Sequence, residues 1–121
     1  MANPVNWFEI VGGDAARMQR FYGQLFGWKI DANNPMQYGI VTAEEGGIGG
    51  GIGPAEEGAA GHVTVYVDVD DPAAYLAKVE QLGGKTVVPP TEVPGFGLTF
   101  ALFSDPEGHV VGLTKARSGQ Q

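Results

Sequence analysis

The stretch DAARMQRFYGQLFGWKI, residues 14–30, recurs in altered form 57 positions later (71 minus 14) as DPAAYLAKVEQLGGKTV, residues 71–87. Asp14 matches Asp71, Leu25 matches Leu82 and Gly27 matches Gly84. An internal repeat indicates that one structural unit is used more than once. Because there are only two copies, the repeat predicts a duplicated domain with an internal pseudo-twofold axis and not a solenoid.

Each copy of the repeat predicts one helix, with a typical capping residue at each end. Asp14 and Asp71 are expected N-caps, because an aspartate carboxylate can accept hydrogen bonds from the free N–H groups of the first turn. Gly27 and the pair Gly83-Gly84 are expected to end the helices, since glycine tolerates the left-handed backbone found there. Helical spacing predicts a core-facing stripe in each helix. These stripes are Met18, Tyr22 and Leu25 in the first helix and Tyr75, Val79 and Leu82 in the second.

Strand-forming residues surround each helix. The expected strands are residues 5–11, 28–31, 37–42 and 47–53 in the first repeat, and 62–69, 86–88, 97–103 and 109–114 in the second. Residues 54–61 read as a linker and residues 116–121 as a frayed tail. The sequence predicts one α+β domain over residues 1–121, with β-α-β-β-β repeats over about 4–54 and 62–115. A curved mixed sheet should surround a cleft, with the helices outside.

Composition argues against several partners and sites. The chain has 121 residues and a formal charge of −7 with no basic stripe, so neither nucleic acid nor an anionic membrane surface is an expected partner. No apolar run approaches the roughly 18 residues of a membrane span, and the first residues lack the pattern of a signal peptide. A cytoplasmic protein is therefore expected. The absence of cysteine excludes disulfides, thiolate zinc sites and cysteine nucleophiles.

The run GGIGGGIG, residues 46–53, invites comparison with a phosphate-binding loop. It fails the spacing G-x-G-x-x-G of dinucleotide sites and does not lead into a helix. The run is therefore expected to be a strand without side chains on which a ligand or a partner strand can lie close to the backbone.

Three segments carry a resemblance to a known family: residues 8–28 (FEIVGGDAARMQRFYGQLFGW), 67–87 (VDVDDPAAYLAKVEQLGGKTV) and 105–113 (DPEGHVVGL). They resemble the vicinal-oxygen-chelate superfamily, which includes glyoxalase I, extradiol dioxygenases and the fosfomycin- and bleomycin-resistance proteins. The resemblance implies the duplicated fold but no single reaction, because one fold can host many activities. It also implies a homodimer, since chains of this size in the family commonly pair.

The resemblance places the family's metal ligands at Trp7, at Thr64 and at Gly112. Tryptophan and glycine side chains offer no ligand atom, and a neutral threonine hydroxyl is a poor ligand for Zn²⁺, Fe²⁺ or Ni²⁺. No cofactor is therefore expected. Glu9 and His62 share strand faces with Trp7 and Thr64, but they would supply only two ligands to a rebuilt site.

Aromatic side chains on the predicted strands suit stacking on a flat, apolar ligand, although they would equally fill a core or a dimer interface. Strand alternation does not decide whether Phe100 or Phe103 lies on the same face as the other aromatic side chains. The predicted ligand-binding set is Trp7, Glu9, Tyr38, His62, Thr64, Tyr66, Phe100 and Gly112.

Two functions follow as hypotheses. The first is a metal-independent binding protein of the bleomycin-resistance type, which sequesters an aromatic or apolar ligand such as an antibiotic or another natural product. The second is a glyoxalase-type lyase, isomerase or dioxygenase that uses a displaced metal, or His62 and Glu9 as an acid–base pair. A regulatory or assembly module without a small ligand is a third, simpler interpretation.

Overall fold

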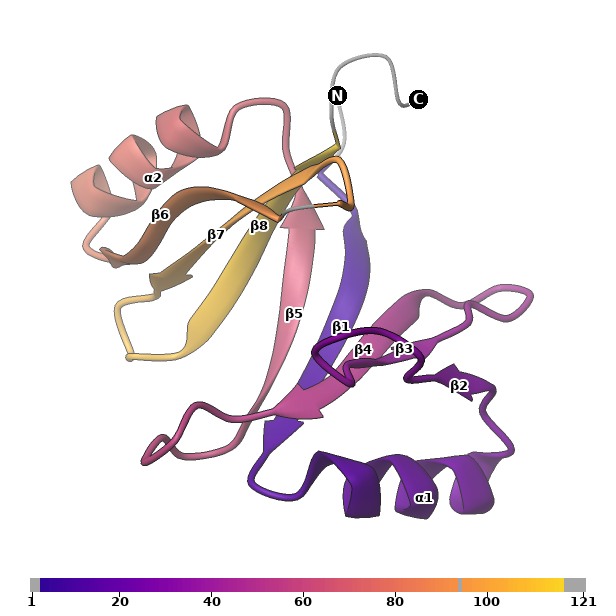
Figure 1. Cartoon of the computed structure of the whole chain (residues 1–121). Coiled ribbons are helices and arrows are strands. Elements are labelled where there is room, and N and C mark those ends of the chain that lie inside the picture. Colours follow the sequence, from indigo (N-terminus) through magenta and orange to yellow (C-terminus); the bar gives the residue numbers. More distant parts are fainter. Residues whose placement is uncertain (1–2, 94, 117–121) are drawn as a thin grey trace. The chain divides into compact units, whose positions relative to one another are not determined.

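The computed structural model describes residues 3–93 and 95–116. The first half of the chain forms β1 (Val5–Gly12), α1 (Ala15–Phe26), β2 (Ile30–Asp31), β3 (Gly39–Val41) and β4 (Gly49–Pro54). The second half forms β5 (His62–Asp68), α2 (Pro72–Gln81), β6 (Lys85–Val93), β7 (Leu98–Ser104) and β8 (Val110–Ala116) (Figure 1). The order β-α-β-β-β occurs twice, so the predicted α+β class is confirmed. Of the predicted frayed tail, residues 117–121 lie outside the described residues.

The chain divides into two compact units. The N-terminal unit comprises Asn6–Thr64, and the C-terminal unit comprises the chain from Val65 onward together with the short stretch that ends at Val5. In the N-terminal unit the strand order is β2-β3-β4-β1, with β1 and β4 parallel and the other neighbours antiparallel. In the C-terminal unit the order is β5-β8-β7-β6, with β5 and β8 parallel. Both units therefore use the same connection pattern.

The helix ends follow the sequence prediction. The carboxylate of Asp14 accepts a hydrogen bond from the backbone N–H of Arg17 at 3.0 Å, and that of Asp71 accepts one from Ala74 at 3.1 Å. Gly27 caps α1 in the left-handed conformation with φ of 72°, where a side chain would be strained. No helix in the described part of the chain is long and apolar enough to cross a membrane.

The predicted core stripes are wrong at their last positions. Leu25 is 56% exposed and Leu82 is 72% exposed. Leu82 is the residue that follows α2, so helical spacing no longer sets its direction. Leu76, at 6% exposure, lies in the core of the C-terminal unit instead. The other buried members of that core are Val69, Ala101 and Leu113, and Val67, Tyr75 and Phe103 pack against it.

An aromatic cluster holds α1 onto the N-terminal sheet. Tyr22 of α1 stacks on Trp28 with ring centroids 5.8 Å apart, and Phe8 of β1 lies 5.4 Å from Trp28. Phe26 completes the cluster, 5.1 Å from Trp28. Such pairs contribute about 0.5–1.5 kcal/mol each beyond the area they bury. Trp28 was expected on a strand, but β2 begins only at Ile30.

Strand β6 is longer than predicted and contains Pro89 and Pro90. It lies at the edge of its sheet, next to β7. An edge strand tolerates proline, because its outward N–H groups have no partner strand to lose. The pairing with β7 shifts register between Thr86 and Val88 and again between Val88 and Thr91. Strand propensity alone predicted only residues 86–88 and therefore missed the second half of β6.

Candidate ligand-binding site

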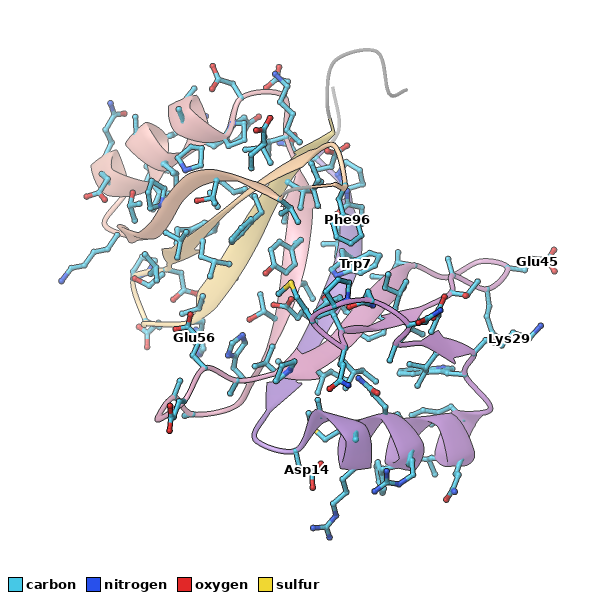
Figure 2. All side chains as sticks on the ribbon, viewed as in Figure 1. Trp7, Asp14, Lys29, Glu45, Glu56 and Phe96 are labelled. Atoms are coloured by element: carbon cyan, nitrogen blue, oxygen red, sulfur yellow. The ribbon has the colours of Figure 1, made fainter. Side chains whose placement is uncertain are left out.

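Three predicted site residues of the N-terminal unit form one hydrogen-bonded chain. Trp7 projects from β1 (Figure 2), and its indole Nε1–H donates to the hydroxyl of Tyr38 at 3.2 Å. The Tyr38 hydroxyl in turn donates to Oε2 of Glu9, also on β1, at 2.9 Å. Trp7 and Glu9 are two residues apart on one strand, so alternation places them on the same face. Tyr38, from the segment just before β3, bridges them.

The backbone of Tyr38 is held on both sides by one side chain. Oδ1 of Asn34 accepts from the Tyr38 N–H at 3.0 Å, and Nδ2 of Asn34 donates to the Tyr38 carbonyl at 2.8 Å. Gln19 of α1 ties the same segment to β4, because its Nε2 donates to the carbonyls of Gln37 at 3.2 Å and Ile52 at 2.8 Å. The position of the tyrosine is therefore set by contacts that do not involve a ligand.

Glycines of β4 make room for the Tyr38 ring. A Cβ added at Gly51 would overlap the Tyr38 ring and hydroxyl, and one at Gly53 would meet its Cδ1 at 2.6 Å. On the other face of β4, a Cβ at Gly50 would overlap the ring of Phe8. Residues 49–53 of the glycine run form part of β4, as predicted, whereas residues 46–48 precede the strand. At Gly50, Gly51 and Gly53 the groups that lie close to the backbone are aromatic rings of the same chain.

Burial and charge keep the Tyr38 hydroxyl protonated. Loss of solvent and the nearby negative charge of Glu9 both raise the pKa of Tyr38 well above its ordinary value. A hydroxyl that stays protonated retains the proton that it donates to Glu9. The Tyr38 hydroxyl therefore remains a hydrogen-bond donor to Glu9 over the neutral pH range.

His62 lies beside this arrangement without a hydrogen bond to it. Its Nε2 is 4.0 Å from Oε1 of Glu9, beyond the range of a direct hydrogen bond. The side chain of His62 is 43% exposed and that of Glu9 is 19% exposed, so solvent reaches both. The structure thus brings Glu9 and His62 together, at a separation that a third polar group could bridge. Thr64, two residues further along β5, is buried.

In the C-terminal unit, Tyr66 of β5 pairs in register with Gly112 of β8. A Cβ at Gly112 would overlap the Tyr66 ring. Phe100 is paired with Thr114 and shares the alternation of Gly112, whereas Phe103 packs against the core with Leu76. Phe100 therefore lies on the same sheet face as Tyr66, and Phe103 lies on the opposite face.

Trp7 and Gly112, two of the positions at which the resemblance implies metal ligands, hold groups that do not fit a divalent cation. The Trp7 nitrogen carries a proton, which it donates to Tyr38, so it has no lone pair to offer. Gly112 has no side chain, and the Tyr66 ring occupies the adjoining space. Within residues 3–93 and 95–116, no group of three or more His, Cys, Asp and Glu is arranged to hold a metal ion.

Two hollows of the N-terminal unit lie away from these residues. One, of about 390 Å³, runs along α1 and is lined in part by Arg20, Gln24 and Trp28. The other, of about 320 Å³, lies between Phe8, Trp28 and the loop before β4. Neither is lined by a predicted ligand-binding residue.

His109 belongs to a separate feature, the turn between β7 and β8. Oδ1 of Asp105 accepts from the backbone N–H groups of Glu107 and His109, both at 2.9 Å, and Oδ2 lies 3.1 Å from Nδ1 of His109. The bond from the His109 N–H is the main cause that lowers the pKa of Asp105. This arrangement stabilises the turn between β7 and β8.

Sequence reasoning missed Asn34 and Gln19, which hold Tyr38 in place. Gln19 carried a usable signal, because the repeat matches it to Leu76 (19 plus 57), a core residue of the C-terminal unit. A glutamine at a core-facing helical position has polar atoms that need partners. Asn34 carried no comparable signal, because nothing in the sequence identifies Tyr38 as the residue that it holds.

Comparison with known proteins gives the family. Residues 5–113 match the model of the Glyoxalase/Bleomycin resistance protein/Dioxygenase superfamily. The chain is 35% identical over 78 residues to the Putative glyoxylase CFP32 of Mycobacterium bovis, a match that covers 64% of this chain and 30% of the relative. It is 30% identical over 119 residues to the anthracycline biosynthesis protein DnrV of Streptomyces peucetius, with 84% of this chain and 43% of the relative covered.

The chain thus spans less than half the length of both relatives. The fold is similar to the crystal structure of a superfamily member from Vibrio splendidus 12B01, with a TM-score of 0.67 at 15% identity and coverage of 94% of this chain and 99% of that one. The match over residues 5–113 shows that the chain belongs to the glyoxalase/bleomycin resistance protein/dioxygenase superfamily.

Proposed function

We propose that the chain binds a flat, apolar small molecule on the face that carries Trp7, Glu9 and Tyr38, without the help of a metal. The observation that carries this proposal is the anchored indole. Its N–H is held by Tyr38 at 3.2 Å, so the ring is fixed before a ligand arrives. A preorganised aromatic surface loses little conformational entropy on stacking, which favours affinity.

The named relatives support the choice of ligand class. DnrV is named an anthracycline biosynthesis protein, and anthracyclines are flat, fused-ring molecules of the kind that stack on an indole. We infer that sequestration of such a ligand, in the manner of a bleomycin-resistance protein, is the function of this chain.

Tryptophan substitution tests the binding site, because the chain has two tryptophans in different surroundings. An anthracycline would be titrated by calorimetry into the wild type, Trp7→Phe and Trp28→Phe. We expect Trp7→Phe to weaken binding about tenfold or more, by an amount typical of one lost stacking contact. Trp28, within the α1 cluster, serves as the matched control and should leave the affinity within about twofold. Equal affinity in all three proteins would remove Trp7 from the site.

The approach of His62 to Glu9 favours a second candidate, a lyase, isomerase or dioxygenase of the glyoxalase type. An imidazole 4.0 Å from a carboxylate can move a proton once a substrate group lies between them. The name of CFP32 points to the same class. Turnover of a glyoxalase-type substrate that is lost in His62→Ala, and kept in the turn variant His109→Ala, would favour this candidate over simple binding.

We propose further that the chain forms a homodimer through α1. Phe21 and Leu25, one turn apart on the helix, are both more than half exposed, and exposed apolar surface of this kind marks interaction sites. The relatives, more than twice as long as the matched stretch, have room for a second unit of this size. Light scattering should give twice the chain mass of 12.7 kDa, falling to the monomer in Phe21→Glu/Leu25→Glu. A wild-type monomer at micromolar concentration would overturn the proposal.

A further inference from the structure

We propose that the hollow along α1 is a second ligand site, which takes a small aromatic molecule bearing a carboxylate. Its volume of about 390 Å³ falls in the range of small-molecule pockets. It lies within the N-terminal unit and is lined by residues of α1 together with Trp28 and Ile30 of β2. The site goes beyond the proposed function, because none of the predicted ligand-binding residues lines this hollow.

Arg20 of α1 supplies a positive charge to the hollow. It is exposed, and within residues 3–93 and 95–116 its guanidinium has no hydrogen-bond or ion-pair partner. A guanidinium presents its N–H donors in a planar fork that matches the two oxygens of a carboxylate. Because the chain as a whole carries a formal charge of −7, a carboxylate would be held by this local charge and not by the overall field of the protein.

Two glutamines flank the arginine in different ways. Gln24 lies four residues after Arg20, so the two side chains are neighbours on one face of the helix. The Gln24 amide also has no partner among the described residues, which leaves it able to donate to a ligand. Gln19, by contrast, is tied to the carbonyls of Gln37 at 3.2 Å and Ile52 at 2.8 Å. It therefore forms a fixed side of the hollow.

Trp28 gives the hollow an aromatic wall. Its ring is packed against three other rings, with centroids 5.8, 5.1 and 5.4 Å away, which belong to Tyr22, Phe26 and Phe8. A wall held by its neighbours needs no rearrangement when a ligand packs against it, which favours affinity. An aromatic surface and a guanidinium thus line one hollow, and this combination suits an aromatic carboxylate.

Gly23 gives the hollow its depth. A Cβ at this position would meet Cδ1 of Ile30 and the carbonyl oxygen of Trp28, both at 3.7 Å, which is ordinary van der Waals contact. The packing of the fold therefore does not require glycine here, and glycine inside a helix is less favourable than alanine. The absence of a side chain at Gly23 is explained by the space that it leaves in the hollow.

Two probes with one ring system test the site: 2-naphthoate and its neutral isostere 2-naphthamide. Each would be titrated by calorimetry into the wild type and into Trp7→Phe, in which Trp28 is the single tryptophan and its indole N–H resonance reports on the hollow. We expect 2-naphthoate to bind both proteins equally and to shift the Trp28 resonance. It should bind about tenfold or more tightly than 2-naphthamide, because only the carboxylate forms charge-assisted bonds.

Arg20→Gln and Arg17→Gln separate the local charge from the overall charge. Both remove one positive charge from α1, but Arg17 does not line the hollow. Arg20→Gln should weaken 2-naphthoate about tenfold or more and leave the affinity for 2-naphthamide within about twofold. Arg17→Gln, the matched control, should leave both affinities within about twofold, since distant exposed charges are screened.

Gly23→Ala separates the site from the stability of the helix. The variant should be at least as stable as the wild type in urea unfolding, because alanine is the better helix former. It should nevertheless bind both probes about threefold or more weakly, because the methyl group takes up space that the ligand needs. Unchanged affinity for both probes in this variant would show that they do not occupy the hollow.

The remaining outcomes distinguish this site from the Trp7 face. Absence of binding to the wild type, or equal affinity for the two probes, would overturn the inference and leave the proposed function standing. Binding of 2-naphthoate that is lost in Trp7→Phe and kept in Arg20→Gln would place the probe at Trp7. That result would overturn the second site and support the proposed function.

Discussion

The two units use glycine and tyrosine in related but different ways. In the C-terminal unit, Tyr66 lies on the first strand and its ring covers Gly112 of the parallel strand. The equivalent position in the N-terminal unit is Glu9 (66 minus 57), which pairs with Gly51. There the ring over the glycine comes from Tyr38, outside the strand pair. The C-terminal unit fills the space over the glycine with a tyrosine of its own strand. The N-terminal unit has a carboxylate on that strand, and the ring of Tyr38 fills the space.

This difference shows how a duplicated unit can acquire a polar site. A glutamate in place of a strand tyrosine leaves the space over the glycine to be filled by another ring. In the N-terminal unit Tyr38 supplies both the ring and the donor. The two helices also differ in polarity. Leu76 of α2 is buried in an apolar core, whereas its counterpart Gln19 of α1 donates to the carbonyls of Gln37 and Ile52.

The largest expected effect tests the contrast between the two helices. Leu76→Ala removes a buried side chain from the C-terminal core and should lower the free energy of unfolding by about 2–5 kcal/mol. Leu25→Ala removes an exposed side chain of α1 and should cost about 0.5 kcal/mol or less in the isolated chain. Urea unfolding would measure both. A cost for Leu25→Ala as large as that for Leu76→Ala would show that α1 is as deeply packed as α2.

The next largest effects are expected at Gly51 and Gly112, which lie against the rings of Tyr38 and Tyr66. Gly51→Ala and Gly112→Ala place a methyl group within the rings of Tyr38 and Tyr66, and each should cost about 1–3 kcal/mol because overpacking forces the ring to move. Gly13→Ala, which meets nothing within 4 Å, is the matched control. Thermal unfolding measures all three. The double variant Gly51→Ala/Tyr38→Ala should be no less stable than Tyr38→Ala alone, and a further loss would contradict the steric explanation.

Removing the Tyr38 hydroxyl should have an intermediate effect. Tyr38→Phe leaves the Trp7 N–H and the Glu9 carboxylate without this partner and should cost about 1–3 kcal/mol at neutral pH. Since burial raises the pKa of Tyr38 above its unfolded value of 10.0, the folded state holds this proton more tightly. Stability from this group is therefore fully present below about pH 10 and is lost as the pH rises further. Denaturant titrations from pH 8 to 11 should show a steeper decline for the wild type than for Tyr38→Phe, and parallel curves would contradict the raised pKa.

The smallest effect concerns a feature that the two units share. Asp14→Ala and Asp71→Ala each remove an N-cap hydrogen bond of about 3 Å and should each cost about 0.5–2 kcal/mol. Asn at either position should restore most of the loss, because its carbonyl oxygen can accept the same bond. Chemical denaturation would measure the four variants. A cost at one position only would show that the repeat is no longer equivalent at its helix ends.

Much of the fold could be predicted because its signals are local. The caps at Asp14 and Asp71 and the left-handed Gly27 depend on the backbone of a few neighbouring residues. Two of the errors fall where local signals end. Leu82 follows the last helical residue and turns to solvent, and β6 continues through Pro89 and Pro90 because it is an edge strand.

The sequence by itself determined the duplicated β-α-β-β-β order, the helix ends and the presence of Trp7 and Glu9 on one strand face, because each follows from backbone geometry and residue spacing. Only the tertiary structure decided that Tyr38, 31 residues from Trp7 and 29 from Glu9, joins them. Strand alternation specifies the face of a side chain but not which loop covers it. That choice depends on Asn34, on Gln19 and on the space over Gly51 and Gly53, which come together only when the chain is folded.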